Sequence, residues 1–347
     1  MENESYLRWL VRETPTTWWH DSADPEELRR GLDHGATGVT TNPVLTNRAL
    51  RARPEFWAEA VRSVPKDLSP ERRAEELMSH VVRHAARMLQ PQYESTKEKW
   101  GYVCGQVNPV RAGEREAMAA MARRYHDWAP NIAVKLPVTA AGLDVLEDCA
   151  AEGITVTATM SFTVPQVLAV AERYQKGLAR ARKAGKKTGR CFAVIMIGRL
   201  DDYLREVAQD CKAPVSESDI RQAGLAATKR AYALYKERGY EAVLLIAALR
   251  GIHHMTELAG AELSMSIHPS VQGPLLAPGV PREERIDLPI APEVIRRLQT
   301  IPDFVRAYEP DGLAVEEFIG YGVTQRTLSQ FIEAGWALLE SLKSPSG

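Results

Sequence analysis

The sequence contains few cysteines, four in 347 residues, and no Cys-x-x-Cys pair. Cys104, Cys149, Cys191 and Cys211 are widely spaced along the chain. This spacing is typical of reduced thiols in the cytosol rather than of a disulfide framework or a zinc motif.

Long apolar runs and a charge imbalance are also missing. No stretch approaches the roughly 18 apolar residues that cross a bilayer, and the first twenty residues lack the apolar core of a signal peptide. Basic and acidic residues number 44 and 45, so no excess of positive charge favours nucleic acid or an anionic membrane as a partner. We therefore expect a soluble cytoplasmic globular protein.

Eight short strand-like runs are present, and amphipathic helical patterns follow most of them. The runs cover residues 16–21, 37–42, 101–107, 131–136, 154–159, 191–197, 242–247 and 262–267. The helical patterns cover residues 25–34, 113–128, 140–151, 164–184, 217–238 and 252–260. Alternating strands and helices predict a parallel sheet, and eight units predict a closed (β/α)8 TIM barrel formed by a single domain, 1–347.

Two segments exceed what such a barrel needs. Residues 49–99 predict a helical insertion of at least two helices between the second and third strands. Residues 272–347 predict a Pro-rich excursion with one helix near 292–307, followed by a terminal helix over 324–342 that Thr324 caps. The apolar face of the terminal helix leaves two placements open, over the barrel mouth or against a second subunit.

The most informative stretch is Val134-Lys135-Leu136-Pro137, a lysine inside an otherwise apolar strand. Burial there favours the neutral amine over the ammonium. A neutral amine at the end of a barrel strand is the nucleophile that forms Schiff bases with carbonyl substrates. Taken alone, Lys135 is better explained as a lysine that extends to the rim or pairs with a carboxylate, and the residues around it decide otherwise.

Catalytic groups of a (β/α)8 barrel lie at the C-terminal ends of its strands. These ends carry a polar set of mixed charge: Asp21, Asn42, Gln106, Asn108, Lys135, Thr159, Arg199 and Arg250. Asp21 is free for function, because Asp24 directly precedes Pro25 and is the better helix cap. The others have simpler alternatives: a turn before proline for Asn42, an ordinary β-branched strand residue for Thr159, and surface ion pairs for the arginines.

Five blocks of sequence resemble the transaldolase family. They are Gly-Val-Thr-Thr-Asn-Pro-Val-Leu (38–45), Val-Lys-Leu-Pro-Val-Thr-x-x-Gly-Leu (134–143), Glu-Gly-Ile-x-Val-x-x-Thr (152–159), Gly-Arg-Leu-Asp-Asp (198–202), and Arg250 followed by Glu-Leu-Ala-Gly (257–260). They occur in the family's order over residues 16–270. The resemblance implies a (β/α)8 barrel with a Schiff-base lysine at Lys135, and no metal or organic cofactor.

The resemblance also implies roles for the other candidates. Asp21 matches the aspartate that handles the proton of the substrate hydroxyl, and Asn42 matches the asparagine that binds the three-carbon unit. Thr159 matches the threonine that holds a catalytic water together with a residue on strand three. Arg199 and Arg250 match the pair that binds the substrate phosphate, which suits their forked, permanently charged donors. Asn108 is a substrate-binding candidate from its place alone.

This sequence departs from the family pattern at four positions. Transaldolases carry a glutamate where this chain has Gln106, whose neutral amide positions water but relays no proton. Glutamine at this place is similar to the fructose-6-phosphate aldolase branch, which cleaves or joins rather than transfers. Val194 and Ala248 replace serines, and Thr157 replaces an asparagine. The natural donor and acceptor sugars therefore stay open.

The leading hypothesis is a transaldolase-type enzyme that moves a dihydroxyacetone-like unit between a ketose donor and an aldehyde acceptor, both phosphorylated. Catalysis is assigned to Lys135, Asp21, Thr159 and Gln106, and binding to Asn42, Arg199, Arg250 and Asn108. Two alternatives stay open: a simple class I aldolase, and a barrel without turnover that serves as a binding or scaffold protein. A homo-oligomer is compatible with the leading hypothesis and with both alternatives.

Overall fold

The computed structural model describes residues 5–342, in which eight parallel strands close into a barrel in chain order. The strands are β1 (Thr17–His20), β2 (Gly38–Val39), β3 (Tyr102–Gln106), β4 (Ile132–Pro137), β5 (Val156–Thr159), β6 (Cys191–Met196), β7 (Val243–Ala247) and β8 (Ser264–Ile267). Pairing of β8 with β1 closes the barrel. The predicted (β/α)8 barrel is confirmed, and each strand overlaps a predicted run, although β2 is three residues shorter at its end than the run 37–42.

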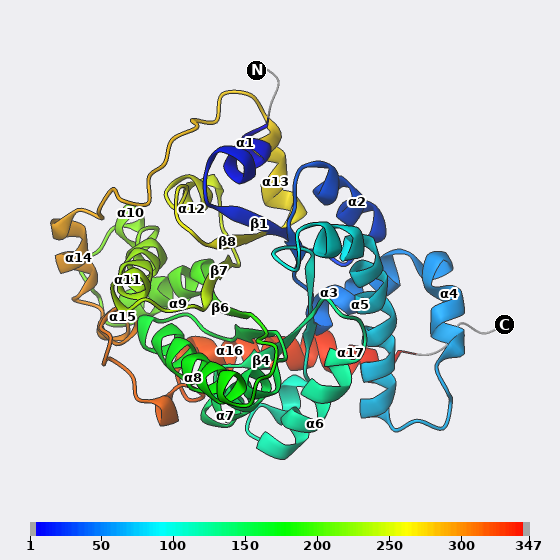
Figure 1. Cartoon of the computed structure of the whole chain (residues 1–347). Helices are drawn as coiled ribbons and strands as arrows, with labels where there is room; N and C mark the ends of the chain where they lie inside the picture. The colour runs from blue at the N-terminus through cyan, green and yellow to red at the C-terminus, as the bar shows by residue number, and fades with distance from the viewer. Residues whose placement is uncertain (1–4, 343–347) are drawn as a thin grey trace.

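Helices surround this barrel (Figure 1). Before β8 they are α1 (Tyr6–Glu13), α2 (Pro25–Asp33), α3 (Pro43–Ala52), α4 (Pro54–Ser63), α5 (Pro70–Ser95), α6 (Arg115–His126), α7 (Ala140–Glu152), α8 (Val164–Lys183), α9 (Ile197–Asp210), α10 (Glu217–Ile220), α11 (Ala223–Arg238) and α12 (Ile252–Thr256). After β8 they are α13 (Pro269–Leu276), α14 (Pro292–Leu298), α15 (Pro302–Tyr308), α16 (Gly322–Phe331) and α17 (Ala337–Glu340). The short 3-10 turn η1 (Pro109–Arg111) follows β3.

Three predicted helices have different bounds in the structure. The pattern over 217–238 is divided between α10 and α11, and the helix predicted near 292–307 is divided between α14 and α15. The second division occurs at Pro302, because the residue before a proline is pushed out of the helical region; Ile301 has φ −94° and ψ 112°. The pattern over 252–260 gives only the short α12.

The prediction that Thr324 caps the terminal helix is wrong. The helix begins at Gly322, and Tyr321 before it is extended, with φ −66° and ψ 133°. The Tyr321 ring is buried and its hydroxyl donates to the Asp303 carbonyl at 2.8 Å. This contact fixes the turn before the helix at Tyr321, which is earlier in the chain than the predicted cap. Thr324 is buried inside the first turn.

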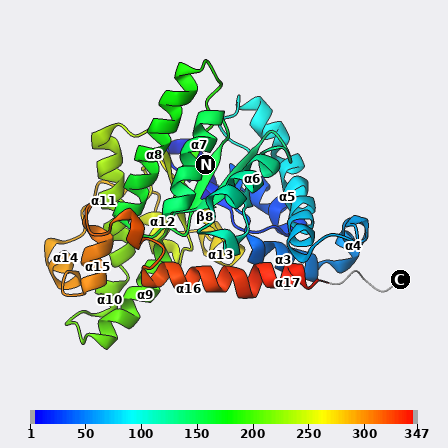
Figure 2. The same cartoon turned by 90° about the horizontal axis from the view of Figure 1, so that it is seen from below.

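The terminal helix lies across one end of the barrel. Helix α16 continues through a π-helical segment, η3 (Ile332–Trp336), into α17, and Figure 2 shows this continuous rod running from α9 toward α3. Gly335 permits close contact with α3, because a Cβ there would lie 2.7 Å from the Val44 backbone nitrogen. Of the two open placements, the structure shows the one over the barrel mouth.

The segment 49–99 contains the end of α3 together with α4 and α5. Helices α4 and α5 and the η3–α17 segment share a second apolar cluster that includes Trp57, Leu77, Met78, Trp336 and Leu339. Two segments that exceed the minimal barrel are thus held to each other by apolar contact.

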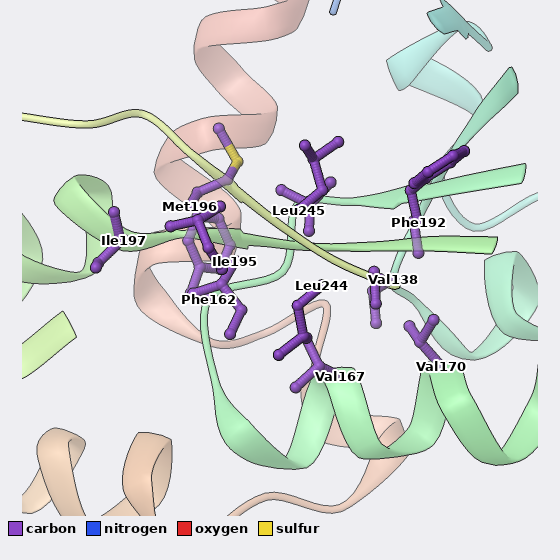
Figure 3. Packing of buried hydrophobic residues seen from close by; sticks show 14 of the residues in the cluster. Val138, Phe162, Val167, Val170, Phe192, Ile195, Met196, Ile197, Leu244 and Leu245 are labelled. Atoms are coloured by element: carbon purple, nitrogen blue, oxygen red, sulfur yellow. The ribbon is translucent and has the colours of Figure 1, made fainter. Parts of the chain in front are cut away.

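The main apolar core lies between the strands and the outer helices. Figure 3 shows Leu244 of β7 pointing toward Val167 of α8, whereas Leu245 points to the opposite side of the strand. The same alternation applies to β4, whose Val134 and Leu136 are completely buried. Lys135 lies between them in sequence and therefore points into the barrel.

Candidate active site

A cavity of about 310 Å³ is formed by residues at the C-terminal ends of the strands and the loops that follow them. Six of the eight predicted site residues line it: Asp21, Asn42, Lys135, Thr159, Arg199 and Arg250. Val194 and Ala248, two of the departures from the family pattern, are also in its wall. The closed barrel thus brings together predicted site residues that are as far as 229 positions apart in sequence, Asp21 and Arg250.

Lys135 is held inside the barrel rather than at its rim. The side chain is only 6% exposed, and its Nζ donates to the Thr41 backbone carbonyl at 3.3 Å. Its neighbours in the sheet are Gln106 on β3 and Thr157 on β5. The amine therefore faces the cavity from an apolar strand and is hydrogen-bonded to a carbonyl rather than to a carboxylate.

Asp21 is oriented by a short chain of hydroxyl groups. Its Oδ1 accepts a hydrogen bond from the Thr40 hydroxyl at 2.7 Å, and Thr40 Oγ1 lies 2.6 Å from Ser266 Oγ. Since Thr40 donates its one proton to Asp21, Ser266 is the donor in the second bond. Asp24 caps α2 by accepting from the amides of Glu26 and Glu27, as the sequence predicts, so Asp21 is not needed as the cap.

Asn42 combines a structural contact with a place in the cavity. Its Oδ1 caps α3 by accepting from the Leu45 amide at 2.9 Å, which leaves its NH2 group as the donor for a ligand. Thr159 is buried on β5, and its hydroxyl has no hydrogen-bond partner within residues 5–342. Leaving a buried polar group unpaired costs about 1–3 kcal/mol, so this hydroxyl is suited to a water or substrate atom.

Gln106 and Asn108 lie outside the cavity lining. Gln106 pairs in register with Lys135 and is buried, and neither polar atom of its amide has a partner in the described chain. Asn108 is held elsewhere: its Nδ2 donates to Glu71 of α5 at 2.7 Å, and Arg111 binds the same carboxylate. Asn108 therefore contributes to an ion-pair network between η1 and α5.

The two arginines enter the cavity from the segments that follow β6 and β7: Arg199 belongs to α9, and Arg250 to the loop after β7. Arg199 donates to Gln330 of α16, and its guanidinium carbon lies 5.7 Å from the centroid of the Phe331 ring. Burial, and secondly the like charge of Arg250, lower the pKa of Arg199. Arg250 binds Asp202 through Nε at 2.9 Å and Nη2 at 2.8 Å.

Gly198 and Ala248 allow the arginines to approach each other. A Cβ at Gly198 would lie 2.3 Å from the Ala248 carbonyl oxygen and 2.5 Å from Arg250 Cγ. Ala248 has φ +58°, a left-handed conformation that costs a non-glycine residue roughly 1–2 kcal/mol. Backbone strain at this point is compatible with a functional turn, because it places Arg250 next to Arg199.

A buried histidine holds the Arg250 backbone in place. The Arg250 amide donates to His254 Nδ1 at 3.3 Å, so the ring proton is on Nε2, 3.0 Å from Asp201 Oδ2. The other oxygen of Asp201 accepts from the Gly224 amide at 2.7 Å. This chain of hydrogen bonds connects the segment after β6 to the segment after β7.

Several lining residues were not among the sequence candidates. They are Thr40, Arg48, Ser266, His268, Ser270, Gln330 and Phe331. The polar residues at and after the end of β8 occupy a strand end, which is the position that identified the other candidates, but the prediction did not include them. Gln330 and Phe331 gave no local signal, because they come from the terminal helix.

Within residues 5–342, no group of three or more His, Cys, Asp or Glu side chains is arranged to hold a metal ion. No helix in that same range is long and apolar enough to cross a membrane.

Comparison with known proteins places this site in a family context. A family model described as Transaldolase/Fructose-6-phosphate aldolase matches residues 18–292. The chain is similar to the transaldolase of Thiobacillus denitrificans, at 30% identity over 231 residues, 63% of this chain and 64% of that protein. For the transaldolase of Neisseria gonorrhoeae the identity is 31% over 188 residues, 53% of this chain and 54% of that protein. The chain thus spans between about half and two thirds of the length of these relatives.

A solved structure of oxaloacetate acetylhydrolase with oxalate aligns with 87% of this chain and 95% of that chain. Its TM-score is 0.32 and its identity 12%, and we draw nothing from a likeness at this level.

Proposed function

The chain belongs to the transaldolase/fructose-6-phosphate aldolase family, and from this premise we propose that it forms, breaks or transfers a ketol carbon–carbon unit through a Schiff base on Lys135. The observation that carries the proposal is the buried Lys135 amine, which lines one cavity together with Asp21 and the Arg199–Arg250 pair. The covalent lysine takes the place of a metal or organic cofactor as the electron sink.

The proposed reaction begins with attack of the neutral Lys135 amine on a ketone carbonyl. Loss of water from the resulting carbinolamine gives the iminium, with Thr159 and Gln106 positioning that water. Asp21 takes the proton of the substrate hydroxyl as the carbon–carbon bond breaks, and the bonding electrons move into the iminium to give an enamine. The aldehyde half of the donor then leaves. In transfer, the enamine attacks an aldehyde acceptor, Asp21 returns its proton to the new hydroxyl, and water hydrolyses the iminium to release the new ketose and free Lys135. In simple cleavage, the enamine is protonated at carbon and the iminium is hydrolysed to release the three-carbon ketone.

The test of this proposal is a product assay with ketose phosphate donors, with and without aldehyde acceptors, read by mass spectrometry. Transfer produces a new ketose only when the acceptor is present, whereas simple cleavage releases the three-carbon ketone in either case. A broad donor panel that gives neither product, and no covalent adduct, would favour a barrel without turnover.

Gln106 determines the balance between the two outcomes in this scheme, because a neutral amide positions water without relaying its proton. We expect Gln106→Glu to shift the ratio of transfer to release toward transfer, since it restores the family's carboxylate. General acid–base help is typically worth about 10²–10⁴-fold, so a partial gain is measurable in the same assay. An unchanged ratio in both Gln106→Glu and Gln106→Ala would mean that residue 106 does not act on the reaction.

The arginine pair is proposed to bind the substrate phosphate. Arg199→Ala or Arg250→Ala should weaken the binding of phosphorylated substrates tenfold to a hundredfold, because a charged hydrogen bond contributes about 1.5–3 kcal/mol. Unphosphorylated analogues should be nearly unaffected. Arg326→Ala is the control, because Arg326 pairs with Glu206 on the surface at 2.6 Å. Equal losses for both classes of substrate would assign the pair a structural role.

A further inference from the structure

We propose that the cavity has a second anion subsite, in which Arg48 binds an acidic group at the end of the substrate farthest from the Arg199–Arg250 pair. The inference rests on the proposed function, since it takes this cavity to be the substrate site. It predicts that the substrates of this cavity carry an acidic group at each end.

The strand order places Arg48 opposite Arg199. In a closed barrel of eight strands in chain order, β2 and β6 are four strands apart and therefore face each other across the barrel. Arg48 belongs to α3, which follows β2, and Arg199 belongs to α9, which follows β6. Figure 1 shows α3 and α9 on opposite sides of the barrel. Both arginines nevertheless line the same cavity.

Arg48 differs from the other two arginines in having its donors unused. Within the described residues its side chain makes no hydrogen bond and no ion pair, whereas Arg250 is held by Asp202 and Arg199 by Gln330. The neighbouring Arg51 of the same helix donates to Asn47 at 3.0 Å. Arg48 is thus an exposed guanidinium on the cavity wall with all five of its N–H groups available to a ligand.

The charge of the cavity also favours a second anion. Its lining includes the three guanidinium groups of Arg48, Arg199 and Arg250, and Asp21 is the one carboxylate among the lining residues. A single phosphate at the Arg199–Arg250 pair leaves Arg48 without a counter-charge. An oxyanion at Arg48 supplies one and can form the bidentate contact for which a guanidinium is suited.

Carbonyl-free ligands test the subsite without Schiff-base chemistry. Calorimetry would compare hexitol 6-phosphate with hexitol 1,6-bisphosphate and with a 6-phosphorylated hexonate, which carries a carboxylate at the other end. We expect at least one doubly anionic ligand to bind tenfold to a hundredfold more tightly than the monophosphate. The ligand with the larger gain identifies phosphate or carboxylate as the preferred group.

Two variants assign the effect to Arg48. Arg48→Gln should remove the advantage of the doubly anionic ligand and leave the monophosphate affinity unchanged. Arg51→Gln removes the same charge from the same helix outside the cavity and should keep the advantage. The proposal is overturned if the wild-type protein does not discriminate between the ligands, or if Arg48→Gln weakens all of them equally.

Failure of this proposal is distinguishable from failure of the proposed function. Binding of a hexitol does not require Lys135 to react, whereas borohydride trapping does not require a second anion. A preference for two anions without any covalent adduct would support the subsite and refute the Schiff base. Covalent trapping without a preference for two anions would support the Schiff base and refute the subsite.

Discussion

Lys135→Arg is expected to abolish covalent trapping and turnover together, because a guanidinium is never neutral at working pH and cannot form the Schiff base. In the wild-type protein, incubation with a hydroxyketone donor followed by borohydride reduction should add the donor's mass to the peptide containing Val134, Lys135 and Leu136. Peptide mass spectrometry of both proteins measures the effect directly.

Lys229 provides a matched control, because it is a second lysine that is largely shielded from water. Burial lowers the pKa of Lys229, and its Nζ donates to the Arg285 carbonyl of a surface loop at 2.8 Å, away from the cavity. Lys229→Arg should trap the donor as the wild-type protein does. A label on Lys229, or on any lysine other than Lys135, would refute the mechanism.

Asp21→Asn should lower kcat by about 10²–10⁴-fold, the usual range for loss of a general base, while Schiff-base trapping at Lys135 is kept. The asparagine can still accept the hydrogen bond from Thr40, so the geometry of the loop is preserved. Steady-state kinetics and borohydride labelling together separate loss of proton transfer from loss of the nucleophile.

Asp24→Asn is the control for that change. It removes a carboxylate three residues away, and asparagine caps a helix about as well as aspartate does. Its kcat should stay close to the wild-type value. An Asp21→Asn protein that turns over normally, or one that no longer traps the donor, would contradict the role proposed for Asp21.

The barrel was predictable because its strands are buried on both faces and appear in the sequence as apolar runs separated by turns. The break at Pro302 also had a local signal in the proline itself. The start of the terminal helix had none, because it depends on the contact between the Tyr321 hydroxyl and the Asp303 carbonyl.

The site was predictable where a residue's role depends on its own strand. Lys135 and Thr159 project from strand ends, and the barrel then brings them to the same cavity. Asn108 occupies an equivalent place, but Glu71 from the α5 insertion binds its side chain. No residue near Asn108 in the sequence indicates that partner. Gln330 was unpredictable for the same reason, since its distance from Arg199 is a property of the whole fold.

The position of the terminal helix makes residues from the last described part of the chain, Gln330 and Phe331, part of the cavity wall. A product of proteolysis or early termination that ends after α15 would retain all eight strands and Lys135, yet it would lack Gln330 and Phe331 from the cavity wall. The Arg199 guanidinium would then lose both of these neighbours and face bulk water. An intact barrel is therefore an insufficient criterion of an active molecule, and preparations should be checked for the integrity of their last twenty-five or so residues, which include α16.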